Sequence, residues 1–195
     1  MKKVQIKFLG SGDAFGSGGR FQTCILIESD DTGFLLDCGA SALIAMKQFG
    51  VSLLYIDSIF ITHLHGDHFG GIPFFILDSQ LISRRSEPLM IAGPPGLEER
   101  IINAMEINYH GSSKVRQKFK IIFKELPETV PTRLGALKVT PFGAVHGSGA
   151  PSYALRVEVS GKTIVYSGDT EWTDSLIKAV DGADLFVKHT TTIKR

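Results

Sequence analysis

Hydrophobic and polar positions alternate near the start of the chain, where polar side chains separate Val4, Ile6 and Phe8. Such alternation predicts a β-strand with one buried face. Two further apolar segments, 23–28 and 33–37, flank a stretch rich in the turn-forming residues Ser, Asp, Thr and Gly, and we expect them to form a hairpin. The first part of the chain is therefore predicted to begin a β-sheet.

Helical spacing of apolar positions occurs at three later places, each with glycine, proline or a cap-forming residue beside it. Helices are predicted over 41–49, 97–109 and 174–180. Further strands are predicted over 56–62, 118–126, 137–140, 153–159, 163–166 and 185–187. Many strands with helices between them indicate sheets covered by helices, in an α/β or α+β layered arrangement. We expect residues 1–195 to form one domain.

Composition and charge are those of a globular domain. Of the 195 residues, 43% are hydrophobic and 21% are charged, which excludes a disordered tail or a coiled coil. The net charge of +1 does not indicate a basic surface that binds nucleic acid. Local basic patches occur at Arg84, Arg85 and 114–124. We interpret them either as binding a phosphate group or as a solvated face.

Cellular context follows from what the chain lacks. No segment approaches the ~18 continuous apolar residues of a membrane span, and the first residues have no apolar signal-peptide core. We therefore expect a cytoplasmic protein without membrane contact. Cys24 and Cys38 lie in apolar segments and are predicted to be buried free thiols in a reducing compartment.

A glycine-rich segment over residues 10–16 follows the first predicted strand. A dinucleotide-binding loop at this point would have to open a helix whose N-terminus holds a pyrophosphate. Here the chain leads into another strand, so a flexible loop between strands is the favoured interpretation. Glycines in such a loop can still line a site, because they allow close approach of the backbone.

Three histidines and one aspartate lie within six residues, namely His63, His65, Asp67 and His68. Packing explains this density poorly, because every buried ring nitrogen would need a partner. His63 and His65 follow a predicted strand and project to the same side on extended backbone. A glycine then allows a sharp turn, after which Asp67 and His68 face the same space. Imidazole and carboxylate favour zinc, with iron or manganese as alternatives, and the two pairs can serve two adjacent ions.

Two distant residues are candidates to complete the site. His146 and Asp169 each come directly after a predicted strand, a position where ligands are commonly mounted on a rigid scaffold. Asp37 also follows a strand, and a turn residue before Gly39 is one interpretation of it.

The motifs in chain order resemble those of the metallo-β-lactamase superfamily: His63-x-His65-x-Asp67-His68, then His146, then Ser167-Gly168-Asp169-Thr170. Three further motifs resemble its ribonuclease Z-like and metal-dependent phosphodiesterase branch: Phe8-Leu9-Gly10-Ser11-Gly12, Leu36-Asp37-Cys38-Gly39 and Ala92-Gly93-Pro94. The resemblance covers nearly the whole chain. It is highly specific for the superfamily and weakly specific for the substrate.

The resemblance implies a four-layer αββα sandwich with a two-zinc site at one edge. It assigns two ligand sets, with His63, His65 and His146 on one zinc, Asp67 and His68 on the other, and Asp169 bridging. It also places Asp37 beside the zinc histidines, where a carboxylate orients an imidazole by accepting its other N–H.

The chain departs from the family pattern after Asp169. Relatives supply one more histidine to the second zinc, whereas the only later histidine here is His189, and the C-terminal segment of the relatives has no counterpart. We therefore expect His189 at the surface, with a substitute ligand as the alternative, and a second metal ion that binds more weakly than the first. A metal-binding remnant without catalysis is one alternative that this departure motivates.

The expected function is a zinc-dependent hydrolase, most simply of phosphodiester bonds. Two zinc ions that share a water lower its pKa toward ~7, and the resulting hydroxide attacks the substrate. Asp67 is the candidate catalytic residue, since it can orient this hydroxide and exchange a proton. Small cyclic or linear nucleotides and an RNA 3′ end are the candidate substrates. Ester, lactone or thioester hydrolysis at the same metals is the other enzymatic alternative, and a homodimer is left open.

The stretch 71–145 contains no obvious counterpart of the long arm with which ribonuclease Z relatives grip tRNA. This departure favours a small phosphodiester over tRNA processing.

Overall fold

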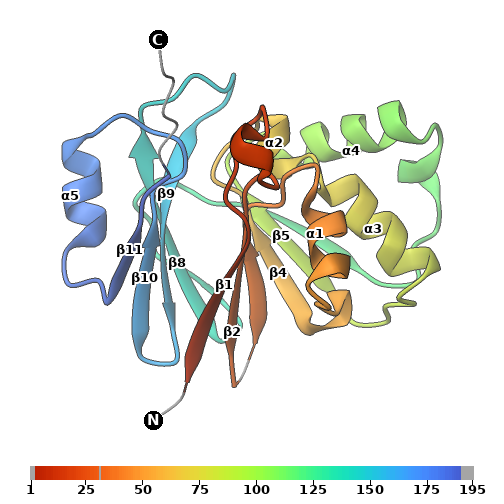
Figure 1. Ribbon diagram of the computed structural model, residues 1–195, viewed down its shortest axis with the longest axis horizontal. Coiled ribbons are helices and arrows are strands. Elements are labelled where there is room, and N and C mark those ends of the chain that lie inside the picture. The colour runs from red at the N-terminus through yellow and green to blue at the C-terminus, as the bar shows by residue number, and fades with distance from the viewer. Residues whose placement is uncertain (1–2, 31, 190–195) are drawn as a thin grey trace.

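Strand-forming segments from the whole chain pair into two β-sheets that pack face to face, with helices on both outer faces (Figure 1). The computed structural model describes residues 3–30 and 32–189. Met1 and Lys2 therefore lie outside the described residues, as do residues 190–195 of the expected domain. The arrangement confirms the predicted αββα sandwich and differs from a single doubly wound sheet.

Within the described residues, the first sheet has six strands in chain order: β1 (Val4–Gly10), β2 (Cys24–Ser29), β3 (Gly33–Leu36), β4 (Ile56–Phe60), β5 (Leu89–Gly93) and β6 (Ile121–Glu125). The first three pair antiparallel, and β2 and β3 form the predicted hairpin. From β3 onward the neighbours are parallel. The carboxyl ends of these parallel strands therefore share one edge of the sheet, where ligands of such sheets commonly bind.

The second sheet has the order β11-β10-β9-β8-β7. Its strands are β7 (Thr132–Leu134), β8 (Leu137–Ala144), β9 (Ser152–Val159), β10 (Lys162–Tyr166) and β11 (Leu185–Val187). Neighbours from β7 to β10 are antiparallel, and β11 joins β10 in parallel. Since β8, β10 and β11 run in the same direction, the loops that follow them lie at one end of the sheet.

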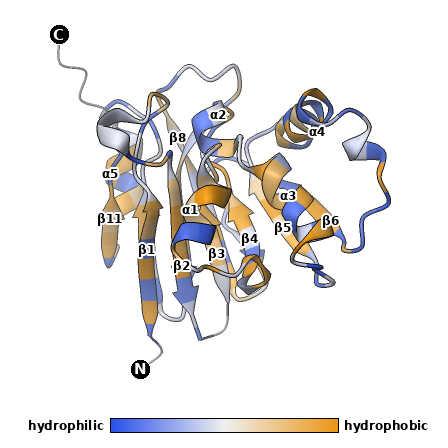
Figure 2. Ribbon diagram, turned by 45° about the vertical axis from the view of Figure 1, so that its right-hand side comes forward, coloured by the Kyte–Doolittle hydropathy of each residue, from blue (hydrophilic) through white to orange (hydrophobic). Residues whose placement is uncertain are grey.

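Helices α1 (Ala42–Gln48), α3 (Ile72–Leu81) and α4 (Leu97–Asn108) cover the first sheet, and α5 (Asp174–Val180) covers the second (Figure 1). One hydrophobic core lies between the first sheet and its helices, and another lies between the two sheets. Apolar residues accordingly concentrate on the strands (Figure 2). Among the described residues, no helix is long and apolar enough to cross a membrane.

Several local predictions are confirmed. Helices α1, α4 and α5 lie where apolar spacing places them, and the Thr173 side chain caps α5 by accepting a hydrogen bond from the Leu176 backbone N–H. The glycine-rich segment is a loop that passes through the short 3₁₀ helix η1 (Ser17–Gly19) into β2. Two other 3₁₀ helices are η2 (Leu53–Tyr55) and η3 (Ser112–Lys114). Cys24 and Cys38 are buried and free.

Two buried elements were not predicted from the sequence. In α3, seven of the ten residues are buried, so the helix shows no polar face from which a helical period could be recognised. Pro73 is tolerated because it lies in the first turn, where backbone N–H groups have no partner within the helix. Strand β5 lies between two parallel neighbours and shows only a short continuous apolar run.

Arg85 corrects the interpretation of the first basic patch. Its residue surface is only 2% exposed, so it forms no part of a solvated face and cannot meet a phosphate from solution. Its guanidinium donates hydrogen bonds to the carbonyl oxygens of Leu53 and Ile56, and lies 6.0 Å from the Phe75 ring centroid and 5.9 Å from that of Phe119. This cation therefore ties η2 and the start of β4 to the helical layer.

Candidate metal centre

The predicted ligands lie on loops that follow strands of both sheets. The histidine cluster follows β4, whereas His146 follows β8 and Asp169 follows β10. These loops meet at the edge of the sandwich to which the carboxyl ends of their strands point (Figure 1). The structure thus brings all six predicted metal ligands into one small space: His63, His65, Asp67, His68, His146 and Asp169.

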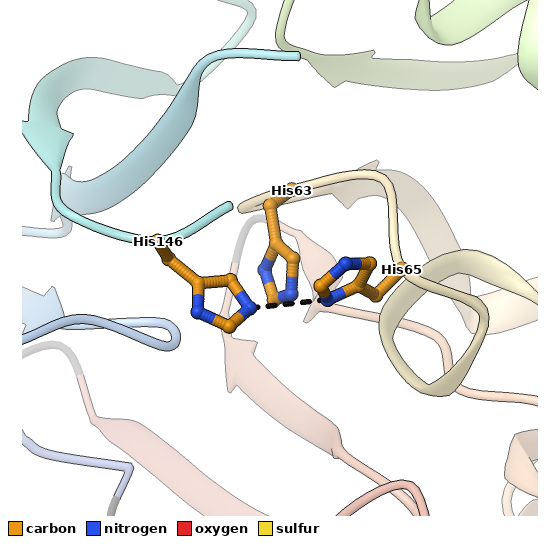
Figure 3. Close-up of side chains that lie close together, drawn as sticks. All are labelled: His63, His65 and His146. Carbon is orange, nitrogen blue, oxygen red and sulfur yellow. Dashed lines mark hydrogen bonds between the residues drawn. The ribbon is translucent and has the colours of Figure 1, made fainter. Parts of the chain in front are cut away.

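Three imidazoles form the first group. His63, His65 and His146 point toward one another from two separate loops (Figure 3). One nitrogen from each lies within 4.8 Å of the others. Nδ1 of His65 lies 3.0 Å from Nε2 of His146. Two nitrogens bound to one tetrahedral zinc are about 3.3 Å apart, given Zn–N bonds of ~2.0–2.1 Å, so the spacing fits a shared ion.

A second group forms around His68. Nε2 of His68 lies 3.4 Å from Oδ2 of Asp67 and 3.4 Å from Oδ1 of Asp169. The other oxygen of Asp169, Oδ2, is 3.9 Å from Nε2 of His146. Asp169 therefore lies between the two groups with one oxygen toward each, which is the position of a bridging ligand.

Asp37 orients the imidazole of His68. It is fully buried, and its Oδ2 accepts a hydrogen bond of 2.7 Å from Nδ1 of His68. Its Oδ1 accepts one of 2.8 Å from the Thr62 backbone N–H. Because Asp37 holds the proton on Nδ1, Nε2 of His68 faces the site, where it would offer its lone pair to a metal ion that displaces its proton. The structure therefore places the Asp37 carboxylate beside one of the candidate ligand histidines, and Asp37 is not merely a turn residue.

His63 is oriented through the same network. The Thr62 hydroxyl lies 3.0 Å from Oδ2 of Asp37 and 3.0 Å from Nδ1 of His63. Since a carboxylate only accepts, the hydroxyl donates to Asp37 and accepts from Nδ1–H of His63. Nε2 of His63 is buried and has no hydrogen-bond partner, a costly arrangement that a bound cation would relieve.

The electrostatics of the site also favour a cation. Burial opposes the charged form of His68, but the carboxylates of Asp37, Asp169 and Asp67 outweigh it and raise the pKa of His68 to about 12. Burial and the neighbouring His68 lower the pKa of His63 to about 4, so His63 stays neutral and able to act as a ligand. Three carboxylates around buried imidazoles form the mixed nitrogen and oxygen donor set that zinc binds.

The backbone around the cluster differs in one detail from the expectation. Gly66 does not form a sharp turn but begins the short helix α2 (Gly66–Phe69), with His65 at its N-cap. Asp67 lies in its first turn and His68 in its last, and Leu64 packs in the core. A helical turn thus replaces the expected glycine turn while it still directs Asp67 and His68 toward the site.

His189 contradicts the expected surface position. Its side chain is only 10% exposed, and its Nδ1 is hydrogen bonded to Oδ1 of Asp169. Its backbone N–H donates a 2.9 Å hydrogen bond to the Ser167 hydroxyl. The parallel pairing of β11 with β10 places residue 189 beside the loop that carries Asp169. Both strands were predicted, but the sequence contains no signal for their register.

Glycine is required at two points where the backbones of the site meet. A Cβ added to Gly39 would lie 2.3 Å from the Asp67 carbonyl oxygen. Gly168 has a φ of +55° and would place a Cβ 2.9 Å from the Thr62 side chain. These close approaches hold the loops after β3, β4 and β10 in fixed relative positions.

Solved structures of the same fold define the class of this chain. Human tRNase Z, short form (ELAC1), has a TM-score of 0.76 and 28% sequence identity, covering 95% of this chain and 76% of that one. The metallo-β-lactamase fold protein YhfI from Bacillus subtilis has a TM-score of 0.74 at 23% identity, covering 94% of this chain and 69% of that one. With the site above, these likenesses identify a metal-dependent hydrolase of the metallo-β-lactamase superfamily, in its ribonuclease Z-like branch.

Sequence relatives narrow this class to a family. Ribonuclease Z of Methanothermobacter thermautotrophicus is 31% identical over 229 residues, which cover 96% of this chain and 74% of that protein. The family described as "Anti-Pycsar protein Apyc1" matches residues 4–194. The chain belongs to this family.

Proposed function

We propose that this chain is a two-metal phosphodiesterase whose substrates are small nucleotide-type phosphodiesters, cyclic or linear. The convergence of three histidines with a second group built on His68 and Asp169 is the observation that supports it most directly. Ribonuclease Z relatives and the human tRNase Z neighbour place phosphodiester cleavage in the same branch. An RNA 3′ end remains the second candidate substrate, favoured by those names.

The two groups would hold two divalent ions, which we propose to be zinc. His63, His65 and His146 would bind one ion, Asp67 and His68 the other, and Asp169 would contact both. Such a pair of ions supplies activation of water at neutral pH and neutralisation of charge on the phosphoryl group. Imidazole donors favour zinc over magnesium or calcium, with manganese and iron as alternatives.

Asp67 would move the proton. Its side chain is 11% exposed, and its Oδ2 lies 3.4 Å from Nε2 of His68 in the second group. Burial opposes its ionisation, but the hydrogen bond and positive charge of His68 outweigh it and lower the pKa of Asp67. Asp67 is therefore a carboxylate at neutral pH, able to accept a proton from the attacking water and return it to the leaving oxygen.

The fold supports a small substrate. Ribonuclease Z relatives with tRNA substrates would need a gripping arm, and none is formed by residues 71–145, all of which are described. This stretch forms α3, β5, α4, β6, β7 and β8, and its longest connection, residues 109–120, contains η3. A short diester can reach the metal centre without such an arm.

A substrate panel tests the proposal. Zinc-loaded protein is assayed with bis(p-nitrophenyl) phosphate, p-nitrophenyl phosphate and p-nitrophenyl acetate, with and without EDTA. We expect turnover of the diester that EDTA abolishes, with little turnover of the monoester or the acetate. Faster cleavage of the acetate would instead indicate an ester hydrolase, and zinc binding without any turnover would indicate a metal-binding remnant.

A further inference from the structure

Exposed apolar side chains lie directly beside the metal centre. Val145 precedes the candidate ligand His146 in the chain and is 54% exposed. Trp172 follows Asp169 by three residues and is 60% exposed. Their loops follow β8 and β10, at the edge of the sandwich where the metal ligands lie (Figure 1). Three residues of chain span at most about 11 Å, so Trp172 lies close to the bridging carboxylate.

The backbone around Trp172 is fixed on both sides. The Val145 backbone N–H donates a 2.9 Å hydrogen bond to the Thr170 hydroxyl. The Glu171 backbone N–H donates one of 3.2 Å to the Val145 carbonyl oxygen. The residue after Trp172 is Thr173, the N-cap of α5. Trp172 is therefore held between a hydrogen-bonded loop and the start of a helix, and its backbone position relative to the metal ligands is defined.

A cation contacts the indole ring. Nζ of Lys188 lies 5.5 Å from the ring centroid of Trp172, within the range of a cation–π contact. Lys188 directly precedes His189, whose imidazole is hydrogen bonded to Asp169, so the cation comes from a segment that is itself tied to the metal centre. Since 60% of the surface of Trp172 stays exposed, the ring still offers an uncovered area to a planar ligand. A ring that is ordered before the ligand arrives lowers the entropy cost of binding.

We propose that Trp172 is a stacking platform for the nucleobase of the substrate, which holds the base while the attached phosphate lies at the metal centre. The inference rests on the proposed function, because that function places a nucleotide phosphate between the two metal groups. A base is separated from its phosphate by one sugar ring, which is comparable with the three-residue span from Asp169 to Trp172. Since every base has a π-face, the platform accepts purines and pyrimidines alike.

Two ligands that differ by the presence of a base test the platform, namely AMP and ribose 5-phosphate. Isothermal titration calorimetry gives the affinity of the zinc-loaded protein for each. A base stacked on one aromatic side chain raises affinity about 5- to 150-fold, so AMP should bind more tightly than ribose 5-phosphate by a factor in this range. Trp172→Ala should weaken AMP binding by the same factor and leave ribose 5-phosphate unchanged. Trp172→Phe restores an aromatic face and should recover most of the AMP affinity.

Phe49→Ala is the matched control. Phe49 is an aromatic residue of similar exposure, 56%, at the C-cap of α1. Because α1 starts after β3 and leads through η2 to the start of β4, its C-terminal end lies away from the edge that carries the metal ligands. Phe49→Ala should leave both affinities unchanged. Equal affinities for AMP and ribose 5-phosphate in the natural protein, no detectable binding of AMP, or an AMP affinity unaltered in Trp172→Ala each overturn the platform.

Fluorescence of the natural protein reports the contact itself, because Trp172 is the single tryptophan of the chain. A base stacked on the indole quenches its emission. We expect saturable quenching by AMP with a midpoint that matches the calorimetric affinity, and none by ribose 5-phosphate. If Trp172→Ala weakens AMP binding but AMP does not alter the emission of the natural protein, the substitution acts through the fold and the platform is overturned.

Hydrolysis of bis(p-nitrophenyl) phosphate by the same preparations separates this inference from the proposed function. Protein that cleaves the diester but binds AMP and ribose 5-phosphate alike refutes the platform alone. Protein that does not cleave it refutes the proposed function, and the binding data then decide the platform. Quenching by AMP, together with the lost affinity in Trp172→Ala, supports it, and equal affinities overturn it.

Discussion

Replacing Asp37 by asparagine should weaken metal binding although Asp37 is not expected to touch the metal. Asparagine has the same shape but only one acceptor oxygen. In the natural protein the Thr62 backbone nitrogen lies 2.8 Å from Oδ1 of Asp37. Because a backbone N–H can only donate, the asparagine oxygen must remain its acceptor. The amide NH₂ then faces Nδ1 of His68, which is 2.7 Å from the carboxylate in the natural protein.

His68 can relieve this clash only by moving its proton. With Nδ1 as the acceptor, Nε2 carries the proton and points an N–H at the site where its lone pair should bind the ion. Removing a partner that orients a ligand typically costs 10–100-fold in metal affinity, or about 1.4–2.7 kcal/mol. The group around His68 and Asp169 should show this loss, and the three-histidine group should be affected less.

Competition of zinc against a calibrated chelator measures both affinities in the natural protein and in Asp37→Asn. The Asp184→Asn variant is the matched control, because Asp184 also accepts from a side chain and a backbone N–H, Lys162 Nζ at 2.6 Å and Thr163 N at 2.8 Å. It lies away from the metal centre and should bind zinc normally. Equal affinities in Asp37→Asn and the natural protein, with both folded by circular dichroism, would refute the orienting role.

Three further outcomes follow from the structure. Asp67→Ala should lower diester turnover ~10²–10⁴-fold at saturating zinc, with a far smaller effect on the urea midpoint, and an unchanged rate would exclude it as the proton acceptor. Arg85→Ala should lower the free energy of unfolding by about 3 kcal/mol, measured by urea denaturation, because buried carbonyls lose their donor and a cavity remains. Burial opposes ionisation of Asp78, but hydrogen bonds from Lys47 and Ser83 outweigh it and lower the pKa of Asp78. Ionised Asp78 therefore stabilises the fold at pH values above its unfolded pKa of ~3.9. This stabilisation is lost as the pH falls through the lower pKa of Asp78 in the folded protein. The difference in unfolding free energy between the natural protein and Asp78→Asn should stay constant from about pH 5 to 7 and shrink below about pH 4, and a constant difference down to pH 2 would contradict the assignment.

The sequence predicts the metal cluster because its information is local. His63, His65, Asp67 and His68 follow one strand, and backbone geometry over six residues is enough to direct them to one side. The same applies to helices α1, α4 and α5, which each have an apolar and a polar face.

Features that depend on contacts between distant segments could not be predicted in this way. His189 reaches Asp169 only through the register of β11 against β10. Arg85 is buried because η2 and two phenylalanine rings surround it, and an Arg-Arg pair in the sequence gives no indication of this. Helix α3 lacks a polar face, so periodicity does not reveal it.

Stepwise return of zinc to chelator-treated protein, with the rate of bis(p-nitrophenyl) phosphate hydrolysis recorded at each addition, tests most directly that the two groups form one metal-dependent phosphodiesterase site. We predict no hydrolysis without metal, a rise that ends at two equivalents per chain, and no rise for a His146→Ala variant, which loses a ligand of the three-histidine group. Hydrolysis that persists without metal, or full occupancy by two ions without any hydrolysis, would contradict the account.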